Sequence, residues 1–359
     1  MPINLKVKPH NHGHLFFGDS DLARLDIGGD PYFKKLSETD EANFWGLNIV
    51  SCSQDRLSEM PANGLSKFQK TNAYQLAMDS TVPDVFSYLS MISTDPWLTY
   101  LYSRISTMEH VHAMSYSSGV SQAFGARATD FLDILYTDEQ IVHRVDVELD
   151  VAVRFIDAVN RGWVESDYNK KLLLELLVKV LCLEGIKFPF SFFTTWTLNR
   201  AFGNVAQGFC QLLLKIANDE MMIHTTTGVS VLSRLSKSQK FKHLFTSGWF
   251  AEMAEQAILE TELREVAWSN YLLLDGEILG FNHEINTHFI KYWANRRRKE
   301  IGIPYADIKK NDVEIWFDDY RNLNAKHSAL QEIDSVTYQK NTLVNDLYKF
   351  TTRKEQNEN

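Results

Sequence analysis

The hydrophobic positions along this chain follow a helical repeat. Apolar residues recur every three or four positions over long segments, and only eight prolines and seventeen glycines interrupt the 359 residues. The alternation that is typical of β-strands is not sustained anywhere. The pattern therefore predicts an all-α fold with helices at 72–91, 97–119, 139–160, 169–188, 191–232, 247–274 and 283–302.

The organisation of the chain is predicted from where this repeat fades. After about residue 322 the apolar period weakens, and the last nine residues, TTRKEQNEN, are wholly polar. We expect a large helical domain at 1–325 and a flexible C-terminal tail at 326–359. No GxGxxG or GxxxxGK[ST] element occurs, which argues against nucleotide binding through a glycine-rich loop.

Charge and cysteine content narrow the class of protein further. The chain has 37 basic and 46 acidic residues, a net charge of −9, which argues against nucleic acid or an anionic membrane as a partner. Its three cysteines form no CxxC pair, so a disulfide scaffold and a thiolate zinc site are both excluded. The N-terminus lacks an apolar segment of signal-peptide length. We therefore expect a protein of the reducing cytoplasm.

Candidate chemistry comes from carboxylates and imidazoles inside apolar helical sequence. A lone buried charge is very costly, so buried helices normally avoid such residues. Two of the segments also pair an acid with a histidine three or four positions later, on one helical face. The residues are Asp79, Glu109, His112, Glu184, Glu220 and His224.

One Asp, three Glu and two His from four helices are the ligands of a carboxylate-bridged di-iron or di-manganese bundle. Hard oxygen ligands with one imidazole per metal suit iron or manganese and leave positions open for dioxygen. Tyr116 lies four residues after His112 and seven after Glu109, so it projects from the same helical face. The spacing favours a redox-active phenol beside the metals.

These motifs make the sequence resemble the small, radical-bearing subunit of class I ribonucleotide reductase. The resemblance runs nearly end to end, and its most specific element is Glu109-x-x-His112-x-x-x-Tyr116. Other matching segments are Leu15–Gly18, Phe44-Trp45, Met78–Ser80, Leu183–Phe188, Ile216–Glu220, Trp268–Gly276 and Gln331–Tyr338. The family implies a ferritin-like bundle, a homodimer and two iron ions per chain, with di-manganese as the alternative. It also implies dioxygen as the oxidant that converts the tyrosine to a stable radical.

The resemblance also implies roles for single residues. Asp79, Glu109 and His112 match the ligands of the metal nearest the radical. Glu184, Glu220 and His224 match those of the second metal, with Glu109 and Glu220 as the bridges. The remaining matches surround Tyr116 or connect the metals to the surface: Phe188, Phe192 and Ile216 form its apolar sleeve, and Trp45 and Asp219 form a relay from His112.

The tail carries the implied partner. Tyr338 matches the mobile relay tyrosine of the family, and the terminal patch Leu347-Tyr348-Lys349-Phe350 supplies apolar anchors for the large subunit. The implied reaction is the reduction of ribonucleotides to deoxyribonucleotides, with the nucleotide held by that large subunit. A stand-alone di-iron oxidase or oxygenase is the alternative, and a ferritin-like metal store is a third. An oxygenase would not need such a tail, and a metal store would not need Trp45, Asp219 or Tyr116.

Two departures from the family pattern carry structural predictions. The second motif reads Glu220-x-x-x-His224, one residue longer than usual, which is accommodated by an i,i+4 pair or by a one-residue π-bulge. Pro189, five residues after Glu184, predicts a kink or a widened turn. Separately, the basic run at 296–299 is interpreted as a solvated helix face.

Overall fold

The computed structural model describes residues 14–19, 28–47 and 49–321 of the chain. It divides into two units, residues 1–309 and 310–359, which are described separately here. In the second unit the described part is helical over 312–321. The predicted tail at 326–359, with Tyr338, lies outside the described residues. The predicted division of the chain at residue 325 therefore stays a prediction.

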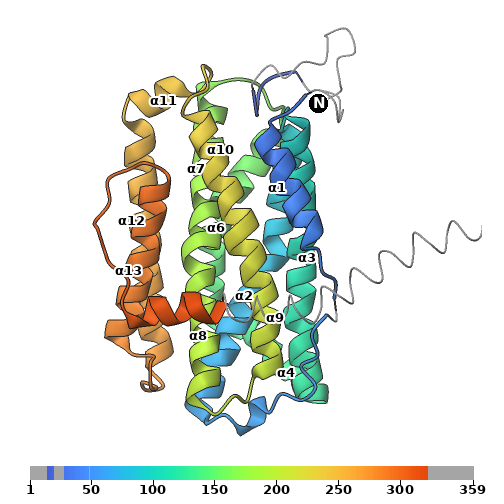
Figure 1. Cartoon of the computed structure of the whole chain (residues 1–359), viewed down its shortest axis with the longest axis vertical. Helices are drawn as coiled ribbons and strands as arrows, with labels where there is room; N and C mark the ends of the chain where they lie inside the picture. Colours follow the sequence, from blue (N-terminus) through green and yellow to red (C-terminus); the bar gives the residue numbers. More distant parts are fainter. Residues whose placement is uncertain (1–13, 20–27, 48, 322–359) are drawn as a thin grey trace, which may run out of the picture. The chain divides into compact units, whose positions relative to one another are not determined.

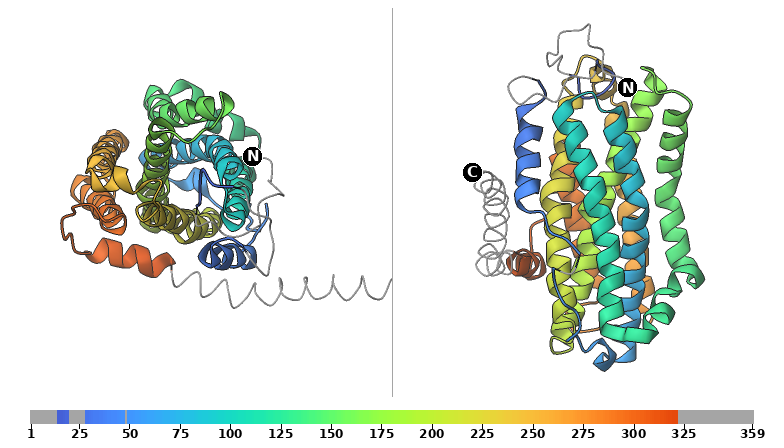
Figure 2. Two further views of the ribbon diagram at one scale, coloured as in Figure 1. Left: turned by 90° about the horizontal axis from the view of Figure 1, so that it is seen from above. Right: turned by 90° about the vertical axis from the view of Figure 1, so that its right-hand side faces the viewer.

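The first unit is a bundle of long helices that run alongside one another (Figures 1 and 2). Among the described residues no β-strand occurs, and only two isolated bridges are present. The α-helices are α1 (Pro31–Ala42), α2 (Ala62–Ile92), α3 (Pro96–Phe124), α4 (Ala128–Leu132), α5 (Ile134–Thr137), α6 (Glu139–Asn160), α7 (Asp167–Cys182), α8 (Phe188–Ala201), α9 (Gln207–Asn218), α10 (Thr225–Leu235), α11 (Lys242–Thr246), α12 (Trp249–Leu273) and α13 (His283–Glu300). Two π-helical segments, η3 (Leu183–Lys187) and η4 (Asp219–His224), join α7 to α8 and α9 to α10. Short 3₁₀ turns lie at η1 (Leu57–Glu59) and η2 (Gly125–Arg127).

Several helices begin at a side chain that accepts from the first free backbone N–H groups. Asp95 accepts from the N–H groups of Trp97 and Leu98, with Pro96 in the first turn of α3. Asp138 caps α6 in the same way, and Asn282 caps α13. These local signals fix where the helices that carry the buried polar residues start.

The core is built around α8, whose residues from Phe188 to Asn199 are all buried. A helix that is apolar on every side belongs in the centre of a bundle. α2 packs along α3 for most of its length, and α8 packs against both α2 and α9. The polar residues of interest therefore lie inside an apolar bundle.

Most predicted helices are confirmed, and the segment 139–160 agrees with α6 to the residue. The single helix predicted at 191–232 is wrong, because α8 ends at Ala201 and α9 begins only at Gln207. Between these two helices, Gly203 and Asn204 each take a positive φ angle, a conformation that breaks a helix. α1 was not predicted.

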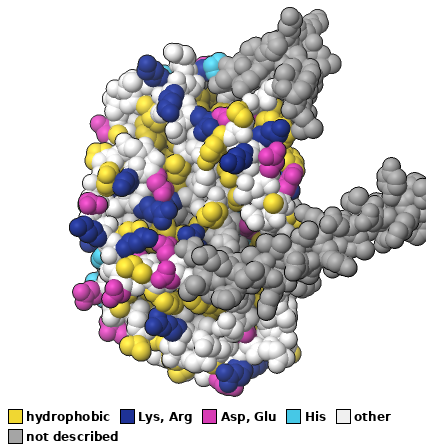
Figure 3. All heavy atoms as spheres, viewed as in Figure 1, with side chains coloured by type: hydrophobic (Ala, Val, Ile, Leu, Met, Phe, Trp, Pro, Cys, Tyr) yellow, Lys and Arg dark blue, Asp and Glu magenta, His cyan; other side chains and the backbone are white. Residues whose placement is uncertain are grey.

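The surface of the first unit is mixed in character. Basic, acidic and hydrophobic side chains are interspersed over the described part of the face shown in Figure 3. None of the described helices is both long enough and apolar enough to cross a lipid bilayer.

Candidate metal centre

Six buried polar side chains meet in the middle of the bundle. Asp79 comes from α2, Glu109 and His112 come from α3, Glu184 comes from η3, and Glu220 and His224 come from η4. Five of them have no exposed surface, and His224 is 3% exposed. The structure thus brings together all six of the ligand residues expected from the sequence.

The six side chains form two groups that share two members. Asp79, Glu109, His112 and Glu220 offer ligand atoms within 4.8 Å of one another, and so do Glu109, Glu184, Glu220 and His224. Glu109 and Glu220 therefore belong to both groups. His112 Nδ1 lies 2.9 Å from Glu220 Oε1, and His224 Nδ1 lies 3.0 Å from Glu109 Oε1. Two shared carboxylates between two imidazoles are the geometry of a bridged pair of metal ions.

The electrostatics of this cluster call for cations. Apart from the imidazole contacts, both oxygens of each carboxylate lack a hydrogen-bond donor among the described residues. Burial, and then the charges of Glu109 and Glu220, raise the pKa of Asp79 well above its usual value. Burial alone would lower the pKa of His112, but the carboxylates around it raise that pKa instead. Two divalent cations would balance the four carboxylate charges.

The long spacing in the second motif is explained by η4. Asp219–His224 is a π-helical segment, which accommodates one more residue per turn than an α-helix. Glu220 and His224 then point to the same side, with His224 Nδ1 2.7 Å from Glu220 Oε2. Of the two alternatives that the sequence left open, the structure shows the π-helical one.

The widened turn expected near Pro189 is also confirmed. η3 covers Leu183–Lys187 and continues without a break into α8, so Pro189, which has no N–H to bond to the preceding turn, lies just after the widened segment. Glu184 thus lies on a π-helical turn. The two π-helical segments, η3 and η4, also contact each other.

Arg297 of α13 packs on the backbone next to Glu184. A Cβ atom added at Gly185 would lie 2.5 Å from Arg297 Cδ, so a larger residue does not fit there. Arg297 is 2% exposed and Arg298 is 5% exposed, so the solvated face predicted for these residues of the basic run is wrong. Burial lowers the pKa of Arg297 to about 10, which leaves it charged at neutral pH. This contact could not be predicted from the sequence, since it depends on how α13 packs.

A polar chain leads outwards from His112. Its Nε2 lies 3.1 Å from Asp219 Oδ2, and the indole N–H of Trp45 donates to the same oxygen at 2.7 Å. The Trp45 and His112 rings are stacked with their centroids 5.6 Å apart. The three residues expected to form a relay are therefore in direct contact.

Tyr116 is fully buried on α3 close to the carboxylates. Burial, and after it the nearby charge of Asp79, raise the pKa of the phenol well above its usual value. The three residues of the expected sleeve, Phe188, Phe192 and Ile216, are also fully buried. The phenol therefore lies in an interior from which water is excluded.

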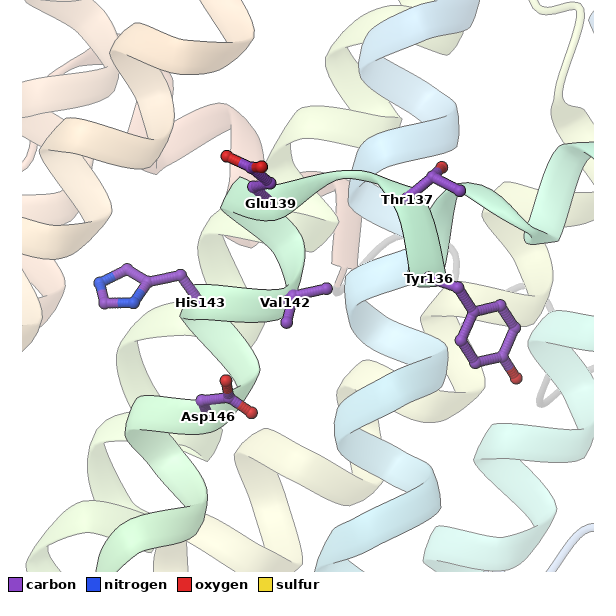
Figure 4. Close-up of a pocket in the computed structure, with 6 residues that line it drawn as sticks. All are labelled: Tyr136, Thr137, Glu139, Val142, His143 and Asp146. Atoms are coloured by element: carbon purple, nitrogen blue, oxygen red, sulfur yellow. The ribbon is translucent and has the colours of Figure 1, made fainter.

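A surface hollow of about 330 Å³ lies elsewhere, where α5 meets α6 (Figure 4). Tyr136 and His143 on its two sides point in opposite directions. Because the polar side chains do not converge on one point, the hollow does not form a second site.

The fold and this centre define a ferritin-like helical bundle with a carboxylate-rich core. The family model described as "Ribonucleotide reductase, small chain" matches residues 29–306. The chain therefore belongs to the family of ribonucleotide reductase small chains. Ribonucleotide reductase is an oxidoreductase, and membership of this family implies a large subunit as partner.

Individual relatives agree with this assignment. The chain is 26% identical over 348 residues to the ribonucleoside-diphosphate reductase subunit beta of Buchnera aphidicola subsp. Schizaphis graminum, covering 90% of each chain. The ribonucleotide reductase R2 subunit from Clostridium botulinum superposes with a TM-score of 0.80 at 22% identity, covering 89% of this chain and 98% of that one. The dimanganese(II)-NrdF of Streptococcus sanguinis superposes with a TM-score of 0.61 at 17% identity, covering 82% and 98%.

The contact of Arg297 with Gly185 gives a first prediction. Gly185→Ala places a methyl group against Arg297, and overpacking of this kind costs about 1–3 kcal/mol. Because the displaced backbone carries Glu184, we expect weaker metal binding together with a lower melting temperature.

Gly228→Ala on α10 is the matched control, since its added Cβ would meet its nearest neighbour only at 3.9 Å. We expect this variant to bind metal as the unmodified chain does. Isothermal titration calorimetry with iron(II) under anaerobic conditions measures the affinity of both variants for the metal. Equal affinities would contradict a role for the Gly185 contact in placing Glu184.

Proposed function

We propose that this chain is the radical-generating subunit of ribonucleoside-diphosphate reductase. The observation that carries the proposal is the pair of buried ligand groups that share Glu109 and Glu220, with Tyr116 beside them. The radical would be used for the reduction of ribonucleotides to deoxyribonucleotides on the large subunit. A cytoplasmic location and a homodimer are part of the proposal.

The donor set fits two metal ions. Asp79, Glu109 and His112 would hold the ion nearer Tyr116, and Glu184, Glu220 and His224 would hold the other. Carboxylate oxygens with one imidazole per ion suit iron or manganese, and we propose iron. When bound, the pair of ions would supply, with dioxygen, the one-electron oxidation of the phenol.

The chain's own residues would make the radical persistent. Tyr116 would give up one electron to the dioxygen-oxidised metal pair and its phenolic proton to the neighbouring Asp79 carboxylate. The fully buried side chains of Phe188, Phe192 and Ile216 would keep water and external reductants away from the resulting radical. A radical that cannot meet a reductant decays slowly.

The contact of Trp45 with Asp219 and His112 supports the reductase over a stand-alone oxidase. An oxidase completes its reaction at the metals and needs no route to the surface. In the proposed function the oxidising equivalent passes along these three residues. When Trp45 loses an electron, the Asp219 carboxylate can take its indole proton. Tyr338, in the tail outside the described residues, would continue the route to the large subunit.

Metal content tests the ligand set. Glu109→Ala removes a carboxylate common to both groups, so we expect binding of the pair of ions to be lost. The bundle should still fold, because the change also removes one charge from a crowded buried cluster. Glu252→Ala, at an exposed position of α12, is the control. Two tightly held ions per chain in Glu109→Ala, measured by metal analysis after gel filtration, would refute this ligand set.

Turnover tests the tail. Tyr338→Phe removes only a hydroxyl group, so the Tyr116 radical and the complex with the large subunit should remain. Nucleotide reduction should be lost, because a phenylalanine ring cannot release a phenolic proton. Deletion from Asn341 onwards should instead keep the radical and weaken association with the large subunit. Full turnover by the Tyr338→Phe protein would remove this residue from the route.

A further inference from the structure

A buried ion pair joins α6 to α12. Arg144 donates from Nε to Glu265 Oε1 at 3.1 Å, and its Nη2 lies 2.6 Å from both carboxylate oxygens. Glu265 has no exposed surface and Arg144 is 7% exposed. Taking two charges out of water is costly, and two apolar side chains often stabilise a core equally well. Stability alone therefore does not account for this pair.

The guanidinium group lies against two aromatic rings that can be oxidised. Its Cζ is 3.5 Å from the ring centroid of Tyr74 and 4.5 Å from that of Trp268. The two rings are 6.2 Å apart, and Trp268 is 5.5 Å from the ring of Tyr271. Lys70 Nζ lies 4.3 Å from the centroid of Tyr271. Each ring of this aromatic triad, Tyr74, Trp268 and Tyr271, thus has a cation over it.

The triad starts on the helix that carries Asp79. Tyr74 precedes Asp79 by five residues on α2, which is a rise of about 7.5 Å along the helix axis and a rotation of about 140° around it, so the two side chains lie on different faces of α2. The other end of the triad, Tyr271, is partly exposed. A series of phenol and indole rings from this part of α2 to the surface would compete with Tyr116 for oxidising equivalents.

The cation over these rings opposes the loss of an electron from them. A neutral aromatic face attracts a cation through its quadrupole, but a ring that has lost an electron repels it. The repulsion is strong because a buried site screens charge weakly. Trp45 differs from Tyr74 and Trp268, since its indole N–H donates to the Asp219 carboxylate. Tyr271, at the surface end of the triad, likewise donates its hydroxyl to a carboxylate, that of Asp138, so the contrast concerns Tyr74 and Trp268. A negative group stabilises an oxidised ring and accepts its proton.

We propose that Arg144, held by Glu265, is an electrostatic guard that keeps Tyr74 and Trp268 reduced and so directs oxidising equivalents to Tyr116. The inference rests on the proposed function, because it requires an oxidant at the metal centre. The suppressed step moves one electron from the Trp268 indole to the dioxygen-oxidised centre. The indole is left as a cation radical, and the centre is reduced by that one electron.

Removing both charges tests the guard. Arg144→Met with Glu265→Leu leaves no lone buried charge. After iron(II) and dioxygen are added, we expect fewer Tyr116 radicals per chain by electron paramagnetic resonance. Peptide mass spectrometry should find about thirty-fold more oxidation at Trp268 and Tyr74, the factor to which a desolvated cation–π contact of about 2 kcal/mol converts. If this variant does not fold, Arg144→Gln with Glu265→Gln provides a second neutral pair.

The matched control is Arg154→Met with Glu175→Leu. This change removes a more exposed pair between α6 and α7, at 2.6 Å, with the same change in charge. We expect its radical yield to equal that of the unmodified chain. Adding Trp268→Phe to the first variant should restore the yield, because the easily oxidised indole is gone.

The outcomes separate this inference from the function on which it rests. An unmodified chain that forms no Tyr116 radical would refute the proposed function. A normal radical in that chain, with unchanged yield and unchanged residue oxidation after removal of Arg144 and Glu265, would overturn the guard alone.

Discussion

The structure depends on one physical constraint, the burial of four carboxylates and two imidazoles in an apolar bundle. A single unpaired carboxylate in such surroundings costs several kcal/mol, so the cluster is tolerable only if the charges are compensated. The imidazoles of His112 and His224 compensate part of the charge through close contacts to Glu109 and Glu220. Two divalent cations would compensate it in full, and this requirement links the fold to the proposed chemistry.

The same constraint is visible in the helices that carry the cluster. Glu184 lies on η3, and Glu220 and His224 lie on η4, so two of the four segments are π-helical where they reach the centre. On α2, Pro83 lacks the N–H that would bond to the carbonyl of Asp79 in a regular helix. Regular helical geometry was thus modified at the ligand positions, as is common at functional sites.

The features that could be predicted from the sequence are those set by residues close together in the chain. Helix 139–160 was predicted to the residue because its periodicity and its cap, Asp138, lie in the same segment. The six cluster residues were found because acids and histidines stand out in apolar helical sequence. The break at Gly203 and Asn204 was missed because apolar residues continue on both sides of it. The contacts of Arg144 and Arg297 were not predictable, since each depends on a helix distant in the sequence.

In the proposed function, the metal-loaded cluster and dioxygen would oxidise Tyr116. Low-temperature electron paramagnetic resonance, recorded after iron(II) and dioxygen are added to the metal-free protein, detects the resulting radical. We expect a tyrosyl signal in the unmodified chain and none in Tyr116→Phe, with equal iron content in both. Persistence of the same signal in Tyr116→Phe would place the radical on another of the fourteen tyrosines and contradict the account.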